Sequence, residues 1–212
     1  MQPMKNYREV LKDRTRCILY QASPSSENCA GWIGGRAPGF FDDKADLIQK
    51  DDRIYYFYLT LVNPFDPQKM ISVFIPTEYE DYLEKNMYPD CSIKVVEHPV
   101  TSESAKDIYT HPGLLKHSIS GGEIVEDPKS MDQSFLIKLG GNPRLIQDED
   151  YYFSKLEEDS FSFLFQVDED GYPDNLIKED HSYPFGFGAL YVFAKIMPDE
   201  LQNPIAGFWQ FS

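Results

Sequence analysis

Basic residues are scarce in this sequence, and their scarcity excludes two common classes of partner. The 212 residues include 20 lysines and arginines against 35 aspartates and glutamates, which gives a formal net charge of −15. Nucleic-acid binding depends mainly on neutralising phosphates with Lys and Arg, so a field of this sign opposes it. Anionic membrane surfaces repel the protein for the same reason. We therefore expect no nucleic-acid partner and no membrane partner, whereas a basic protein partner fits the charge.

Cysteines and long apolar runs are also few. The three cysteines, Cys17, Cys29 and Cys91, are odd in number and widely spaced, which favours a reducing compartment over a disulfide-stapled fold. No stretch approaches the roughly 18 apolar residues of a membrane span. The first ten residues lack the apolar core and the cleavage site of a signal peptide. These absences predict a soluble, cytoplasmic protein.

Motifs that carry catalysis or bind metals are incomplete. Asp90-Cys91-Ser92 resembles the start of an NlpC-type peptidase motif, but the next four residues have a strand pattern where a helix start is needed. The four histidines lack the spacing of metal ligands, and Asp168-Glu-Asp-Gly171 lacks the oxygen donors of a calcium loop. No phosphate-binding loop is present. We predict no catalytic residues, no metal and no cofactor, and lean against an enzyme.

Aromatic residues, in contrast, are abundant, with 14 Tyr, 15 Phe and 2 Trp. Together with the 13 Gly and 15 Pro that punctuate the chain, they favour strands. Strand patterns occur at residues 15–21, 54–62, 70–75, 91–96, 135–139, 161–168, 188–195 and 207–212. Helices are predicted at 4–13 and at 77–86, the second opened by a capping box of Thr77 and Glu80. The expected fold is α+β, predominantly β, as a single globular unit with a few short helices.

Two glycine pairs predict bends at similar places in the two halves of the chain. Gly34-Gly35 precedes Gly140-Gly141 by 106 positions, and a proline follows each pair, as Pro143 does the second. Glycine permits backbone angles closed to other residues, and proline fixes the next φ. The strand pattern at 54 likewise precedes that at 161 by 107 positions.

This agreement in order and spacing indicates an internal duplication. The repeats cover approximately residues 15–96 and 134–212, and a polar, irregular connector at 97–133 joins them within one domain of residues 1–212.

Polar residues around the second bend are the candidate binding residues: Arg144, Gln147, Gln166 and Asp168. A buried amide needs its donors and acceptors matched. The two glutamines therefore either tie the bend to the sheet or orient a ligand there.

The stretch from Lys138 to Gln147, KLGGNPRLIQ, is followed by FLFQVD at 163–168, GFGALYVF at 186–193 and Trp209-Gln210. This series resembles the YwqG-like family of uncharacterised bacterial proteins, which carry a similar Lys-Ile-Gly-Gly bend and a later Leu-Leu-Gln-Ile-Asp strand. The match covers most of the chain and is sharp over about 135–195. The first half departs from the pattern by one extra residue before its proline and by a strand without glutamine. The resemblance implies a bacterial origin and supplies no catalytic residues.

Relatives in that family are often associated with secreted-toxin loci, so the resemblance also implies a toxin-binding or immunity role. Combined with the acidic charge and the missing catalytic motifs, it predicts a non-enzymatic protein-binding module whose partner is a basic protein. The alternative is a small-ligand-binding protein or a hydrolase-like enzyme that uses a cleft between the two repeats. A pocket lined by carboxylates or histidines would favour that alternative.

Overall fold

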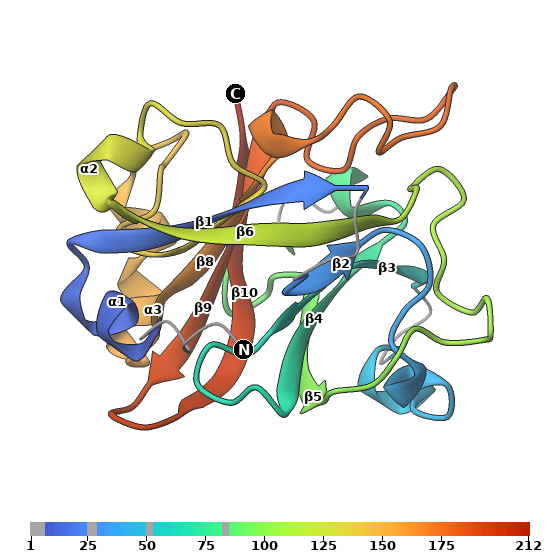
Figure 1. The fold of residues 1–212 in the computed structure, drawn as a ribbon, viewed down its shortest axis with the longest axis horizontal. Helices are drawn as coiled ribbons and strands as arrows, with labels where there is room; N and C mark the ends of the chain where they lie inside the picture. Colours follow the sequence, from blue (N-terminus) through green and yellow to red (C-terminus); the bar gives the residue numbers. More distant parts are fainter. Residues whose placement is uncertain (1–6, 25–28, 50–52, 82–84) are drawn as a thin grey trace.

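One ten-stranded antiparallel sheet organises the part of the chain that the computed structural model describes (Figure 1). The described residues are 7–24, 29–49, 53–81 and 85–212. The strands are β1 (Arg16–Ser23), β2 (Gly31–Ile33), β3 (Tyr55–Val62), β4 (Lys69–Pro76), β5 (Lys94–Pro99), β6 (His117–Glu126), β7 (Ile137–Gly140), β8 (Ser162–Asp168), β9 (Gly188–Ile196) and β10 (Leu201–Phe211). The expected β-rich fold with a few short helices is confirmed.

Helical segments are short throughout the described ranges. The α-helices are α1 (Tyr7–Asp13), α2 (Asp127–Ser130) and α3 (Ser154–Glu158). Single 3-10 turns occur at Gly39–Phe41, Ala45–Leu47, Tyr79–Asp81, Asp150–Tyr152 and Glu169–Gly171. Across the described residues, no helix has the length and apolar character needed to cross a bilayer.

The sheet consists of two meanders with β1 and β6 between them. These two strands are exchanged, so that each lies beside the meander from the other half of the chain. The strand order is β10-β9-β8-β7-β1-β6-β2-β3-β4-β5, so β2–β5 form one meander and β7–β10 another. Between them, β1 pairs with β6 and β7, and β6 pairs with β1 and β2. The end strands β10 and β5 also lie against each other, so the sheet nearly closes on itself. In Figure 1, β1 and β6 run side by side across the molecule between the two meanders.

The segment expected to be an irregular connector, 97–133, contains β6 and α2 and therefore part of the centre of the sheet. That expectation is wrong in its secondary structure. Only one face of β6 packs inward, through His117, Ile119 and Gly122, while Glu123 and Glu126 are exposed. A strand with so few apolar side chains gives a weak alternation signal.

The helix expected at 77–86 is also corrected. The described part contains a single 3-10 turn at Tyr79–Asp81, and residues 82–84 of the expected helix lie outside the described residues. The amide of Thr77 donates to Ile54 O (2.9 Å), which extends the pairing of β3 with β4. The Glu80 carboxylate accepts from the Tyr79 hydroxyl (3.0 Å), so the reciprocal capping contacts do not form.

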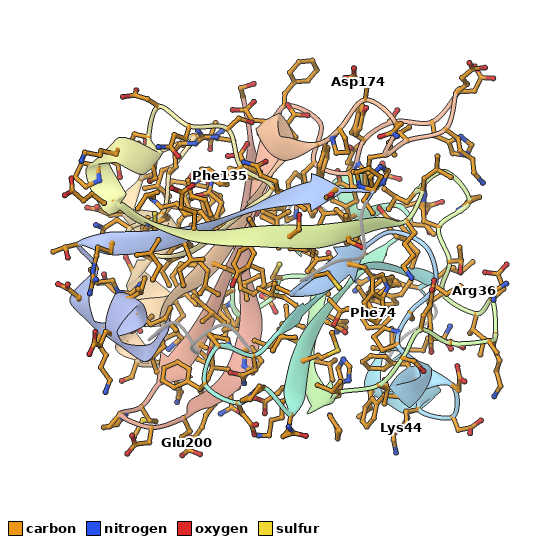
Figure 2. The ribbon with its side chains drawn as sticks, in the orientation of Figure 1. Arg36, Lys44, Phe74, Phe135, Asp174 and Glu200 are labelled. Carbon is orange, nitrogen blue, oxygen red and sulfur yellow. The ribbon has the colours of Figure 1, made fainter. Side chains whose placement is uncertain are left out.

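Apolar side chains form one large core and smaller clusters around it. The large core draws on both meanders, with Leu59 and Val73 from one and Phe165 and Leu190 from the other. A separate cluster contains Phe74, and another contains Phe135 with Cys17 and Leu19. Figure 2 shows Phe74 and Phe135 well apart, in different parts of the sheet. Because the main core draws on both meanders, neither half buries its apolar residues alone.

Candidate functional site

The second glycine pair forms a bend that only glycine fits. Gly140 and Gly141 have φ values of 75° and 63°, in the left-handed region that residues with a Cβ rarely adopt. A Cβ on Gly141 would collide with the Asp127 carboxylate. The first pair, Gly34 and Gly35, has positive φ values as well, 67° and 68°. The glycine pairs at the ends of β2 and β7 therefore have similar positive φ values.

Gln166 holds the loop that follows this bend. Its side chain is fully buried on β8, its Oε1 accepts from Arg144 N (2.8 Å), and its Nε2 donates to Arg144 O (3.0 Å). The same Nε2 lies 3.0 Å from Asp168 Oδ2. Both donors and one acceptor position of the amide are therefore used inside the protein. These are the contacts of a side chain that ties the bend to the sheet.

A second glutamine, Gln210 on β10, holds the next residues of this loop through their backbone groups. It was not among the predicted residues. Its Oε1 accepts from the amides of Ile146 and Gln147 (3.1 Å each), and its Nε2 donates to Gln147 O (2.8 Å). Gln147 itself is exposed and donates from its side chain to Phe211 O (3.0 Å). The signal that could have found Gln210 is a glutamine within an otherwise apolar final strand.

Arg144 and Asp168, the other two predicted residues, form an ion pair. Arg144 Nη2 lies 2.7 Å from Asp168 Oδ2 and 3.0 Å from Asp170 Oδ2, and the guanidinium carbon lies 4.6 Å from the centre of the Phe135 ring. Arg144 and Asp168 line a shallow pocket of about 390 Å³, next to which the Phe187 side chain is 78% exposed. Three of the four predicted residues thus meet, and Gln147 lies at the outer side of the same loop. Their role in binding a partner stays a prediction.

A buried lysine completes the support of the bend. Lys138 on β7 is fully buried, and its Nζ lies 2.7 Å from Asp127 Oδ1 and donates to Asn142 O (2.6 Å). Asp127 Oδ2 accepts from Asn142 Nδ2 (3.0 Å). Burying this pair is tolerable because each charge finds several partners. The contacts connect α2 to the loop, and they are internal to the protein.

A different pocket lies between the two halves of the chain. It has a volume of about 410 Å³. Its walls come from β3, from the 3-10 turn after β4, from the loop before β6 and from the segment between β8 and β9, and its lining residues are Tyr56, Thr77, Glu78, Tyr79, Glu80, Asp81, His111, Asp180, His181, Ser182, Tyr183 and Pro184. Segments far apart in sequence therefore build one cavity, and none of these residues was predicted as a site residue.

Tyrosine hydroxyls connect the segment between β8 and β9, which forms one wall of the pocket, to β3 and to the 3-10 turn after β4. The Tyr172 hydroxyl hydrogen-bonds to that of Tyr58 and donates to Pro184 O (2.9 Å). The amide of Phe185 donates to the Tyr79 hydroxyl (2.6 Å). Burial raises the pKa of Tyr58 and Tyr172 well above the usual value, so both hydroxyls stay protonated. In Figure 1 this orange segment between β8 and β9 extends along the top of the molecule.

Two histidines stand at the edge of this pocket. Their ring centres are 6.1 Å apart, and the His111 ring is 4.2 Å from the Tyr56 ring. The amide of Gly113 donates to His111 Nδ1 (3.1 Å), whereas His181 Nδ1 donates to Glu179 O (3.2 Å). Burial, and then the neighbouring charges of His181 and Lys178, lower the pKa of His111. Neutral His111 is therefore favoured near pH 7, and His181 keeps Nε2 as an acceptor in its neutral form.

The other chemistry considered from the sequence has no support in this geometry. Burial raises the pKa of the Cys91 thiol to about 12, whereas a nucleophilic cysteine needs a lowered value. In the part of the chain that the structure describes, no three His, Cys, Asp or Glu side chains are grouped so that they could hold a metal ion. Asp168 uses its Oδ1 to accept from Asp170 N (3.1 Å), which closes the 3-10 turn after β8.

A scan against protein-family models and a search of curated proteins both find no match for this sequence. The resemblance to the YwqG-like family stays a prediction.

Proposed function

We propose that this protein is a non-enzymatic binding module and that its partner is a basic protein. The observation that carries the proposal is the pocket between the two halves, which is lined by four exposed acidic residues, Glu78, Glu80, Asp81 and Asp180. Among the described residues, none of these four carboxylates forms an ion pair with a lysine, an arginine or a histidine. The net charge of −15 adds a long-range field that attracts a basic partner and speeds association.

The contacts of the pocket histidines support binding over catalysis. A nucleophile is normally activated by a base that accepts its proton through a hydrogen bond. Within the described ranges, neither His111 nor His181 hydrogen-bonds to a serine, threonine or cysteine side chain. Their ring nitrogens instead bond to backbone groups. The described lining of the pocket thus supplies acceptors and negative charge, and neither of its histidines is hydrogen-bonded to a nucleophilic side chain.

The association of YwqG-like relatives with toxin loci makes an immunity protein the specific form of this proposal, in a bacterial cytoplasm. The test is to capture the partner from a native lysate of the source cells, purify it, and measure binding by calorimetry at low and high salt. We expect a stoichiometric complex that weakens as salt rises, because exposed charges are screened. We also expect co-expression to relieve growth arrest caused by the toxin of a neighbouring gene. A partner bound with no salt dependence, together with no relief of growth arrest, would contradict the proposal.

A second candidate is a small-ligand-binding protein or a hydrolase-like enzyme that works in the same pocket. The observation that favours it is the pocket volume of about 410 Å³, which lies in the range typical of small-molecule sites. Hydrolysis of ester, amide and phosphate model substrates by the pure protein, abolished by His111→Ala, would support the enzyme. Absence of turnover with all three classes would favour the binding module.

We also propose that the fold arose by internal duplication of a five-strand unit, β1–β5 and β6–β10. The exchanged positions of β1 and β6, the two meanders and the two glycine bends support this origin. An ancestral half-length chain, built as a consensus of both units, is expected to assemble as a dimer, which size-exclusion chromatography can check.

A further inference from the structure

The pocket between the two halves combines features that together specify one class of ligand. Its carboxylates come from both halves, with Glu78, Glu80 and Asp81 on one side and Asp180 on the other. No lysine or arginine belongs to its described lining. Lys178, whose charge acts on His111, is not part of the lining and donates from its Nζ to Pro112 O (2.7 Å). The lining segments from both halves of the chain therefore contribute negative charge.

A mostly buried tyrosine whose hydroxyl has no partner among the described residues lines the same cavity. Tyr56 lines the pocket and is only 5% exposed, yet its hydroxyl has no hydrogen-bond partner among the described residues. The hydroxyls of the neighbouring tyrosines Tyr58, Tyr79 and Tyr172 all have a partner. The Tyr56 hydroxyl can accept a hydrogen bond from a donor that enters the pocket.

Aromatic rings complete the walls. The Tyr56 and His111 rings lie 4.2 Å apart, and Tyr79 and Tyr183 line the pocket beside them. The faces of aromatic rings attract cations, most strongly where water is displaced. In its neutral form, His181 adds an acceptor nitrogen, Nε2, because its Nδ1 donates to Glu179 O. Acceptors and aromatic faces suit a ligand that carries positive charge and several N–H donors.

We propose that this pocket binds an organic cation, an ammonium or guanidinium group, between the Glu80 and Asp180 carboxylates and beside the Tyr56 hydroxyl. This inference rests on the proposed binding function and names the group of the partner that is recognised. The same chemistry could come from a free amine or from a lysine or arginine side chain of a protein. The volume of about 410 Å³ leaves room for such a group together with part of the chain that carries it.

The experiment is a titration of the full-length, isotope-labelled protein followed by NMR chemical shifts. Agmatine and spermidine serve as free-amine probes, and a short peptide with a single central arginine serves as the side-chain probe. A peptide of the same sequence with citrulline in place of arginine is the uncharged control. We expect saturable shifts at the amides of Tyr56, His111 and His181 with at least one cationic probe and none with the citrulline peptide.

A matched pair of variants distinguishes binding in the pocket from attraction by the overall negative charge of the protein. Asp180 and Asp174 lie in the same segment between β8 and β9, but only Asp180 lines the pocket. Figure 2 shows Asp174 at the outer rim of the molecule. We expect Asp180→Asn to weaken binding about fivefold, as loss of one direct charge contact predicts, and Asp174→Asn to change it less than about twofold. Tyr56→Phe should weaken binding about threefold without changing the fold, since only a hydroxyl is removed.

The outcomes separate this inference from the proposed function. Binding of free amines alone, or of the arginine peptide alone, supports the pocket and identifies the source of the cation. Equal weakening by Asp180→Asn and Asp174→Asn, or shifts that do not saturate with any cationic probe, overturns the inference. A purified basic partner that binds wild type and Asp180→Asn equally also overturns it, while the proposed binding function stands. Failure to find any basic partner counts against the proposed function alone.

Discussion

At the scale of single residues, two buried glutamines replace the pairing that a neighbouring strand would give. Gln166 bonds to both the amide and the carbonyl of Arg144, and Gln210 bonds to backbone groups of Ile146 and Gln147. A loop placed against a sheet has backbone groups that need partners, because an unpaired buried group costs about 1–3 kcal/mol. The shape of the loop after the second bend therefore depends on two side chains.

We predict that Gln166→Leu lowers the free energy of unfolding by about 2–4 kcal/mol. The substitution keeps the side-chain volume nearly constant but leaves Arg144 N without its partner and removes the bond to Asp168. It also removes one of the two donors to Arg144 O, which keeps the Tyr191 hydroxyl. Urea denaturation followed by circular dichroism measures the change.

The control for this prediction is Gln147→Leu. Gln147 is exposed, and its side chain makes single bonds to Phe211 O and the Tyr152 hydroxyl that water can replace. We expect a loss below about 1 kcal/mol. Equal losses in the two variants would show that burial of the Gln166 amide is not what matters.

Sequence reasoning reached part of this residue-scale picture. It placed Arg144, Gln166 and Asp168 around the bend, because they are close in sequence to the glycine pair or lie on the next predicted strand. It missed Gln210 and Asp127, which contact the loop from β10 and α2. Those contacts depend on which strands are neighbours in the sheet, and a single sequence does not contain that information.

At the scale of elements, the glycine pairs end β2 and β7 with left-handed backbone. We predict that Gly141→Ala lowers the free energy of unfolding by about 2 kcal/mol or more. A left-handed residue with a Cβ costs about 1–2 kcal/mol, and the Cβ here would also displace the Asp127 carboxylate from Lys138. Thermal unfolding monitored by circular dichroism measures this change.

Gly186→Ala is the matched control for that substitution. The Cβ at Gly186 would make only an ordinary contact with Tyr183 O, at 3.5 Å, and Gly186 is not among the glycines with positive φ. We expect a change within about 0.5 kcal/mol. A loss at Gly186 as large as that at Gly141 would rule out the left-handed bend as the cause.

The strands differed in how well the sequence predicted them. The patterns for β3, β4, β8 and β9 are nearly continuous apolar runs, because both faces of these strands are buried. β6 is half exposed and contains Ser, Gly and Glu, so its pattern resembles a loop. The helix at 77–86 failed for another reason, since a tertiary hydrogen bond from Thr77 N to Ile54 O overrides the local capping signal.

At the scale of the whole molecule, the pocket could not have been predicted from local patterns. Tyr56, Glu80, His111 and Asp180 belong to four segments that the fold brings together. A pair of histidines 70 positions apart has no spacing that marks a site. The alternative of a cleft between the two halves followed from the repeat pattern, but the lining residues come from β3 and from loops that only the fold brings together.

This exchange makes the two halves dependent on each other. β1 belongs to the first half of the chain, yet its partners β6 and β7 both come from the second half. The buried stretch from Cys17 to Tyr20 would lose both neighbouring strands if the second half were removed. Exposed apolar strands with open edges aggregate, so neither half should fold alone.

We therefore predict that fragments 1–107 and 108–212 are insoluble or unfolded when expressed separately but form a complex when co-expressed. The cut lies in an exposed stretch between β5 and β6, where Asp107 and Ile108 are both exposed, so it breaks few contacts. Different affinity tags on the fragments reveal the complex, and circular dichroism with thermal unfolding shows whether it regains one cooperative transition. A fragment 1–107 that unfolds cooperatively by itself would mean that β2–β5 suffice as a folding unit. In that case the exchange of β1 and β6 would join two stable meanders and would not be what makes each of them fold.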